Sequence, residues 1–169
     1  MKLYKYIVIG PTNSGKTSII TKYFDNNANI SNIKITIGSD FYYKCFSNYK
    51  LHIWDTAGVV KYNNMNSIFE KIDKNNLKVI IVFDYNNYDQ QILDSFINSY
   101  AVYDILIVFN KVPLNHHNLY NYNNKYRNHS ILYVNAAENI NINRIFDINV
   151  NINNTMPPIN KKNKKCSIL

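Results

Sequence analysis

Half of the chain's four glycines stand in one eight-residue stretch, GPTNSGKT, at residues 10–17. The stretch follows an apolar run at residues 2–9, which predicts a strand, and leads into residues 16–24, which predict a helix. A strand, a glycine-rich turn and a helix in this order carry the P-loop pattern G-x-x-x-x-G-K-T, whose backbone N–H groups face an anion. The stretch therefore predicts a phosphate site at the exit of the first strand.

The residue types in this stretch have distinct uses in binding a nucleotide. Lys16 supplies a positive charge for the β- and γ-phosphates, and the Thr17 hydroxyl is suited to ligate Mg²⁺. An ordinary glycine turn is the alternative interpretation, but it does not require the Gly-Lys-Thr ending. The predicted nucleotide-binding residues of the stretch are Thr12, Asn13, Ser14, Gly15, Lys16, Thr17 and Ser18.

Further apolar runs predict a sheet. Residues 39–46 and 49–54 are rich in aromatic and branched side chains and predict a hairpin through Ser47 and Asn48. Residues 78–84, 104–110 and 130–135 are nearly continuous apolar runs, which are typical of strands buried on both faces of a parallel sheet. Stretches of helical length at 59–73, 88–100 and 115–127 lie between the runs. This alternation predicts an α/β fold.

Residues 139–153 give conflicting signals. Apolar side chains recur there at every second position, which favours a strand. Ile142, Ile145, Phe146 and Val150 could instead share one face of a helix, although asparagine is a poor helix former. A covering helix suits the alternation of strands and helices, and we predict a helix.

Length and charge restrict the functional class. A chain of 169 residues fits one domain, and no apolar run is long enough to cross a bilayer. The formal net charge is +8, but four lysines crowd residues 161–165 and only two residues are arginine, which disfavours nucleic-acid binding. Two distant cysteines and the lack of a readable secretion signal predict a reducing, cytoplasmic setting.

Two short motifs complement the phosphate site. In WDTAG at residues 54–58, Asp55 is an acid that can hold Mg²⁺ through water, and the Gly58 N–H can approach a γ-phosphate. In TIG at residues 36–38, the Thr36 hydroxyl can close on Mg²⁺ and the γ-phosphate and release them after hydrolysis. Each motif is weak alone, and an ordinary turn or strand start would explain it. Beside a P-loop, they predict a metal site of Thr17, Thr36 and Asp55.

With these motifs the chain resembles the Ras superfamily of small GTPases, and the Rab branch in particular. TIGSDF at residues 36–41 is similar to the Rab sequence TIGVDF, and YKLHIWDTAG at 49–58 is similar to KLQIWDTAG. The resemblance implies a P-loop GTPase domain over residues 1–153, with a mostly parallel six-stranded sheet, one antiparallel hairpin strand and helices on both faces. It implies GTP or GDP with Mg²⁺ as ligands, and Lys16, Thr36 and Gly58 as catalytic residues.

The resemblance also implies protein partners, namely an exchange factor, a GTPase-activating protein and effectors. Rab effectors read an aromatic triad, which corresponds here to Phe41, Trp54 and Phe69, and we predict an effector surface of these residues and Ile37. The alternative is that these aromatic side chains belong to the core. A small P-loop kinase is a further alternative, but such enzymes rely on arginines to clamp charge, and neither arginine lies near a recognised motif.

Departures from the family pattern are informative. Val59 stands where relatives carry the Gln that orients the attacking water, so we expect slow hydrolysis. The base motif NKxD reads NKVP: Asn110 and Lys111 remain, and Pro113 replaces the Asp that pairs with guanine. In the loop where relatives carry the sequence SAK, this chain has NAA, and its predicted nucleotide-binding residues there are Ala136 and Ala137. A non-hydrolysing pseudo-GTPase with relaxed base specificity is therefore the alternative function.

The last residues predict membrane attachment. CSIL fits the C-a-a-X pattern, with Leu at the end favouring a geranylgeranyl group on Cys166. Because one lipid chain anchors weakly, the preceding lysines would supply the second attraction. We expect residues 154–169 to be a flexible basic tail and the protein to sit peripherally on the cytosolic face of an endomembrane.

Overall fold

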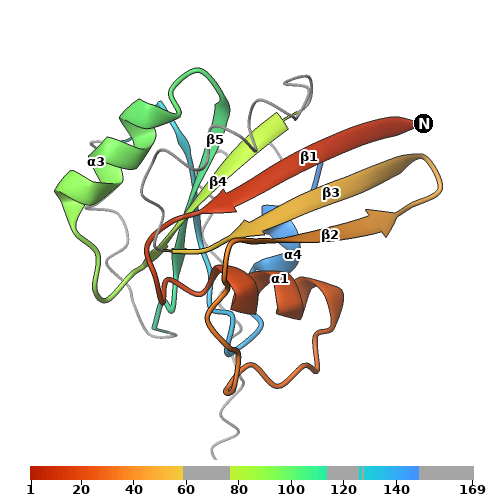
Figure 1. Cartoon of the computed structure of the whole chain (residues 1–169), viewed down its shortest axis with the longest axis horizontal. Helices are drawn as coiled ribbons and strands as arrows, with labels where there is room; N and C mark the ends of the chain where they lie inside the picture. The colour runs from red at the N-terminus through yellow and green to blue at the C-terminus, as the bar shows by residue number, and fades with distance from the viewer. Residues whose placement is uncertain (59–76, 114–125, 127, 149–169) are drawn as a thin grey trace, which may run out of the picture.

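The computed structural model describes residues 1–58, 77–113, 126 and 128–148 (Figure 1). In chain order the elements are β1 (Lys2–Ile9), α1 (Lys16–Phe24), β2 (Ser39–Cys45), β3 (Tyr49–Thr56), β4 (Leu77–Asp84), α3 (Gln90–Ser99), β5 (Asp104–Asn110), β6 (Ser130–Tyr133) and α4 (Ile142–Ile145). The strands form one six-stranded sheet in the order β2-β3-β1-β4-β5-β6. Among the pairings of these six strands, only β2–β3 is antiparallel. The predicted α/β fold is confirmed.

The predicted strands and helices agree with the structure to within two residues at most ends. β3 runs to Thr56, two residues further than its apolar run, and β6 ends at Tyr133, two residues earlier. The helix expected over residues 88–100 spans Gln90–Ser99. The helical stretches predicted at 59–73 and 115–127 lie outside the described residues, apart from Tyr126, which is in a turn.

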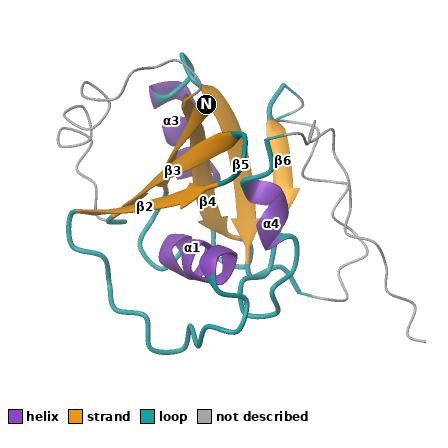
Figure 2. Cartoon of the chain, turned by 90° about the vertical axis from the view of Figure 1, so that its right-hand side faces the viewer, coloured by secondary structure: helices purple, strands orange, loops and turns teal. Residues whose placement is uncertain are grey.

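Helices cover both faces of the sheet, as predicted (Figure 2). α1 and α4 pack on one face, where Ile19, Ile20 and Ile145 join the inward side chains of the strands. α3 packs on the other face through Leu93 and Ile97. β1, β4 and β5 contribute side chains to both clusters because they are buried on both sides, which explains their almost continuous apolar sequences.

The residues that begin the helices are suited to that position. α3 starts after Asp89, whose Oδ1 accepts hydrogen bonds from the backbone N–H groups of Gln91 and Ile92. α1 starts after Gly15, which has a left-handed conformation (φ 89°) and no capping side chain. The N-terminal N–H groups of α1 are therefore open towards the loop at the carboxyl end of β1, where α/β proteins bind anions.

The conflict over residues 139–153 is resolved for the described part. Residues 142–145 form the short helix α4, and residues 146–148 are neither helix nor strand. The predicted helix is therefore wrong for residues 139–141 and 146–148. Asn139 and Asn141 have positive φ angles and turn the chain, and the Asn141 Nδ2 donates to the Tyr133 carbonyl at 2.9 Å. Residues 149–153 lie outside the described residues.

No helix in the described ranges is both long and apolar enough to cross a membrane.

Candidate functional site

A cavity lies where the loop after β1 meets the segment before β2. It has a volume of about 510 Å³. Its lining includes predicted site residues from several separate segments: Thr12, Asn13, Gly15, Lys16, Thr17, Ser18, Thr36, Gly58 and Lys111. The fold thus brings the P-loop, TIG and DTAG motifs to one place, at the carboxyl edge of the sheet, where open α/β sheets bind ligands.

Two glycines let backbone segments approach closely around this cavity. A Cβ on Gly10 would lie 2.0 Å from the Val82 carbonyl oxygen of β4. A Cβ on Gly58 would lie 2.3 Å from the backbone nitrogen of Thr12. The loop between β1 and α1 therefore sits directly against β4 on one side and against the segment after β3 on the other, and neither position has room for a side chain.

Three side-chain oxygens converge beside the cavity, whose lining includes Thr17 and Thr36. Thr17 Oγ1 donates a hydrogen bond to Asp55 Oδ2 at 2.5 Å. Thr36 Oγ1 lies 2.9 Å from Thr17 Oγ1 and 3.3 Å from the same carboxylate oxygen. These three residues come from α1, from the segment before β2 and from β3. They are the three that the sequence predicts as metal ligands.

Asp55 is completely buried, and its environment suits a cation. Burial raises the pKa of its carboxyl group, and the hydrogen bond from Thr17 and the charge of Lys16 counteract that rise. Its second oxygen, Oδ1, is buried and has no hydrogen-bond partner among the described residues. A buried carboxylate with an unsatisfied oxygen beside two hydroxyls is a donor set that fits Mg²⁺, which prefers oxygen ligands and keeps several waters.

The threonine hydroxyls are essential to this candidate metal site. Within the described ranges, no three His, Cys, Asp or Glu residues lie close enough together to hold a metal ion. A site at Asp55 would therefore have one protein carboxylate, and its other ligands would come from hydroxyls, water and phosphate. This composition is typical of Mg²⁺ sites that bind metal together with phosphate.

Lys16 is buried against the loop that it belongs to. Its Nζ donates to the carbonyl oxygens of Gly10 at 2.9 Å and Pro11 at 2.8 Å. Burial lowers the pKa of this ammonium group to about 8, partly offset by the negative charge of Asp55. Two neutral carbonyls therefore hold the ammonium group in the loop, and no carboxylate of the described residues forms an ion pair with it.

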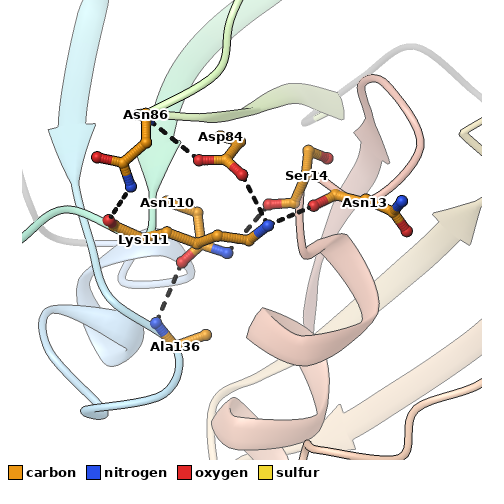
Figure 3. A network of polar contacts seen from close by, with 7 residues as sticks. All are labelled: Asn13, Ser14, Asp84, Asn86, Asn110, Lys111 and Ala136. Atoms are coloured by element: carbon orange, nitrogen blue, oxygen red, sulfur yellow. Dashed lines mark hydrogen bonds and ion pairs between the residues drawn. The ribbon is translucent and has the colours of Figure 1, made fainter.

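A second polar network joins the P-loop to β5 and the loop after β6 (Figure 3). Asn110, which is almost fully buried, uses both ends of its side chain. Its Nδ2 donates to the Ser14 carbonyl at 3.0 Å, and its Oδ1 accepts from the Ala136 N–H at 3.1 Å. Three predicted residues, Ser14, Asn110 and Ala136, are therefore directly connected.

Lys111 extends this network to a residue that the sequence analysis missed. Its Nζ donates to the Asn13 carbonyl at 2.8 Å and lies 2.7 Å from Asp84 Oδ2 (Figure 3). Asn86 also contributes: its backbone N–H donates to Asp84 Oδ1, and its Nδ2 donates to the Lys111 carbonyl. Asp84 could have been suspected, because it is an acid that directly follows a buried apolar run.

The remaining residues of the predicted base site are less connected. The Ala136 N–H, which we expect to meet a guanine oxygen, donates to Asn110 in this structure. Ala137 and Pro113 are exposed. Pro113 has no side-chain hydrogen-bond acceptor, so it cannot replace the carboxylate that the NKxD pattern would place there.

Isoleucines of the loop before β2 also line the cavity. Ile30, Ile33 and Ile35 are among its lining residues, and Ile30 packs against the core cluster on the α1 face. Asparagine, serine and lysine stand beside these isoleucines in the sequence. The recurring isoleucines were the available signal, because apolar side chains in a polar loop need something to contact.

The described residues of the predicted effector surface are exposed or half-buried. Ile37 is 95% exposed and Phe41 is 50% exposed. The rings of Phe41 and Trp54 have centroids 5.1 Å apart, and His52 contacts both rings. Phe69, Val59, Cys166 and the lysine tail lie outside the described residues.

Known proteins resemble this chain along much of its length. Residues 5–113 match a family model described as Ras of Complex, Roc, domain of DAPkinase. A probable Rab-related GTPase of Acanthamoeba polyphaga mimivirus is 33% identical over 126 residues, which cover 68% of this chain and 57% of that protein. The Ras-related protein Rab-11B of Dictyostelium discoideum is 32% identical over 122 residues, which cover 66% of this chain and 54% of that protein.

A shorter match involves the human Ras-related protein Rab-20, which is 30% identical over 83 residues, or 49% of this chain and 33% of that protein. The chain therefore spans little more than half of the length of the mimivirus protein and of the Dictyostelium Rab-11B. The matched region of the family model contains the P-loop, the threonines and aspartate of the candidate metal site, and Asn110.

Proposed function

Because this chain belongs to the Rab-like small GTPases of the Ras superfamily, we propose that it binds GTP and GDP with Mg²⁺ and acts as a slowly hydrolysing switch in membrane trafficking. The observation that carries the proposal is the convergence of Thr17, Thr36 and Asp55 beside the buried ammonium group of Lys16. This arrangement offers oxygen ligands for a metal and positive charge for phosphates within one cavity.

In the proposed complex, Lys16 and the open N–H groups at the start of α1 hold the phosphates. Thr17, Thr36 and Asp55 would hold Mg²⁺. When bound, the metal would supply positive charge that stabilises the phosphates. The Gly58 N–H contacts the γ-phosphate, since the absence of a side chain permits that approach.

At the base end, Asn110, Lys111, Ala136 and Ala137 form the wall against which the guanine lies. Their network also holds the P-loop, because Asn110 and Lys111 bond to the carbonyls of Ser14 and Asn13. Binding a base at this wall would therefore stabilise the phosphate loop as well.

The switch consists of the loop that carries Thr36. With the γ-phosphate bound, Thr36 and Gly58 are held in place, and an effector reads a surface of Ile37, Phe41, Trp54 and Phe69. After hydrolysis Thr36 loses its ligand and the surface changes. An exchange factor and a GTPase-activating protein would set the rates of the two transitions.

Slow hydrolysis is proposed because Val59 offers no hydrogen bond to orient the attacking water. Single-turnover hydrolysis of bound GTP by the wild type and by Val59→Gln tests this proposal. We expect the variant to be at least about tenfold faster, because it regains a positioned catalytic group. Equal rates in both proteins would show that Val59 is not the cause of slow hydrolysis.

Nucleotide binding itself is tested by titrating the purified chain with a fluorescent GDP analogue in the presence of Mg²⁺. We expect saturable binding that Lys16→Ala abolishes. Lys34→Ala is the matched control, because it also removes a lysine from the cavity lining but lies outside the P-loop. A chain that binds neither guanosine nor adenosine diphosphate at about millimolar concentration, a weak-binding limit, would overturn the proposed function.

We further propose that Cys166 carries a geranylgeranyl group and that the lysines at 161–165 attract an anionic leaflet, which would place the protein on the cytosolic face of an endomembrane. In vitro prenylation with labelled geranylgeranyl diphosphate tests this proposal. Label should appear on the wild type and be absent from Cys166→Ser.

A further inference from the structure

β2 is an edge strand of the sheet within the described part of the chain (Figure 1). It spans seven residues, Ser39–Cys45, and pairs in continuous register with β3 on its inner side. It contains neither proline nor glycine. Proteins normally protect such an edge with a bulge, a proline or outward-pointing charges, because its unpaired backbone groups can pair with another strand.

The backbone groups that face outward can be identified from the β2–β3 pairing. The Phe46 N–H donates to the Tyr49 carbonyl, and the Gly38 carbonyl accepts from the Ala57 N–H. Because hydrogen-bonded positions alternate along an antiparallel strand, the even-numbered residues of β2 pair with β3. The N–H and C=O groups of Phe41 and Tyr43 therefore point to the open edge.

The sequence of this edge is complementary to itself. If two copies of β2 pair antiparallel about a two-fold axis at Tyr42, Asp40 of one copy lies opposite Lys44 of the other. In the same register Phe41 of one copy lies opposite Tyr43 of the other. The outward-facing N–H and C=O groups of the two copies therefore meet. Opposite charges and paired aromatic rings are cross-strand combinations that stabilise antiparallel strands.

Three of the four side chains involved are exposed, and the fourth, Lys44, is half-buried and must turn its ammonium group away from neighbouring rings to meet Asp40 of the other copy. Phe41 and Tyr43 are 50% and 63% exposed, and their rings stack with centroids 6.4 Å apart. Asp40 is exposed and has no hydrogen-bond or ion-pair partner among the described residues. Lys44 folds its ammonium group over the rings of Tyr23 and Phe24, at 4.6 and 5.7 Å from their centroids, and does not shield the edge with an outward charge.

We propose that the open edge of β2 is a self-association surface, through which two copies of this chain pair antiparallel about Tyr42 and extend the sheet across the two molecules. A two-fold pairing of this kind is closed, because each copy offers the same edge once. The contact is small, so the association is weak and is measured at high protein concentration. This inference does not depend on nucleotide binding.

Sedimentation equilibrium of the full chain at about 10–500 µM, the range for a weak contact, tests the proposal. We expect dimers and no larger species. Asp40→Lys and Lys44→Asp should each weaken self-association at least about tenfold, since each places like charges opposite one another. A mixture of the two variants should associate again, because the lysine introduced at position 40 of one chain then lies opposite the aspartate introduced at position 44 of the other.

The control for these charge changes is Glu138→Lys, which alters the net charge as Asp40→Lys does but lies far from β2 in the chain, beyond β6. It should leave the dimer intact. Loss of association in this control would show that net charge alone is responsible and would overturn the proposed register.

A second pair of variants tests the backbone. Tyr43→Pro removes an N–H that points to the open edge, whereas Tyr43→Ala removes only the ring. We expect Pro to abolish the dimer and Ala to weaken it, with cooperative thermal unfolding retained in both variants.

Two results would overturn the proposal. The first is a wild type that remains monomeric at the highest concentration, and binding of an added extended peptide by that monomer would show that the edge serves a different partner. The second is a dimer that Asp40→Lys and Tyr43→Pro do not affect, since its interface would lie elsewhere.

Discussion

Thr36 Oγ1 lies 2.9 Å from Thr17 Oγ1, so a residue from the loop before β2 meets the first turn of α1 through a hydroxyl-to-hydroxyl contact. Asp55, near the end of β3, contacts both hydroxyls. Three segments that are distant in sequence are therefore joined at a single point, and each oxygen at that point is also a suitable metal ligand.

Thr36→Ala should lower the affinity for Mg²⁺, so that a higher Mg²⁺ concentration is needed to retain the nucleotide. The change removes one of the three converging oxygens, and the loss of a metal-site group commonly costs about 10–100-fold in metal affinity. The rate of release of a fluorescent GTP analogue, measured against Mg²⁺ concentration, reports this effect. Thr36→Ser keeps the hydroxyl and should behave like the wild type. If both variants release nucleotide alike, the hydroxyl is not a ligand.

Nucleotide affinity should fall as the pH rises through the pKa of Lys16, which burial lowers to about 8. Above that pH the free protein loses the ammonium proton, and binding an anion must take the proton up again. From about pH 7 to about pH 9 the affinity should drop roughly tenfold. Calorimetry in buffers of different ionisation enthalpy should detect the proton uptake at the higher pH.

Lys16→Arg is the control for this pH dependence, because a guanidinium group stays charged throughout the range. The variant should bind more weakly than the wild type at neutral pH but with an affinity that does not change with pH. A wild type whose affinity is equally constant would contradict the role assigned to the lysine.

Gly10→Ala should lower the free energy of unfolding much more than Gly38→Ala. Both glycines have positive φ angles, 140° and 78°, so both substitutions strain the backbone by about 1–2 kcal/mol. Only at Gly10 would the new Cβ also collide with a backbone atom, the Val82 carbonyl oxygen, whereas a Cβ on Gly38 meets nothing within 4 Å. Urea unfolding of both variants tests the difference, and equal losses would contradict the close approach.

Pro113→Asp should increase the preference for guanine over adenine nucleotides. The substitution restores the acceptor that the NKxD pattern uses, and buried groups matched to a base commonly discriminate by several kcal/mol. We expect the ratio of GDP to ADP affinity to rise at least about tenfold. Competition of each diphosphate against a fluorescent analogue measures that ratio, with Pro113→Ala as the control. An unchanged ratio in Pro113→Asp would mean that the base does not reach residue 113.

Much of the fold could be predicted from local patterns. β4 and β5 have apolar side chains on both faces, and this identified them as strands buried on both faces of a parallel sheet. The helix prediction was wrong at residues 139–141 because Asn139 and Asn141 have positive φ angles, and the Asn141 side chain also bonds to the Tyr133 carbonyl. Such contacts are not visible in the spacing of apolar residues.

Only part of the candidate site was predicted from the sequence. The P-loop and the threonine and aspartate oxygens belong to motifs with fixed spacing, and the structure brings them together. Asp84 and Asn86 belong to no motif, and their position beside Lys111 follows from the pairing of β4 with β5, which aligns Asp84 with Asn110. A contact created by sheet register cannot be read from either strand alone.

Lys111 donates to the Asn13 carbonyl and Asn110 donates to the Ser14 carbonyl, which ties the two ends of the cavity into one hydrogen-bonded unit. If the proposed complex forms, a nucleoside and pyrophosphate offered as separate fragments would each bind to a part of this one unit, and the first to bind would change the affinity for the second. The intact nucleotide would engage both parts in one binding event.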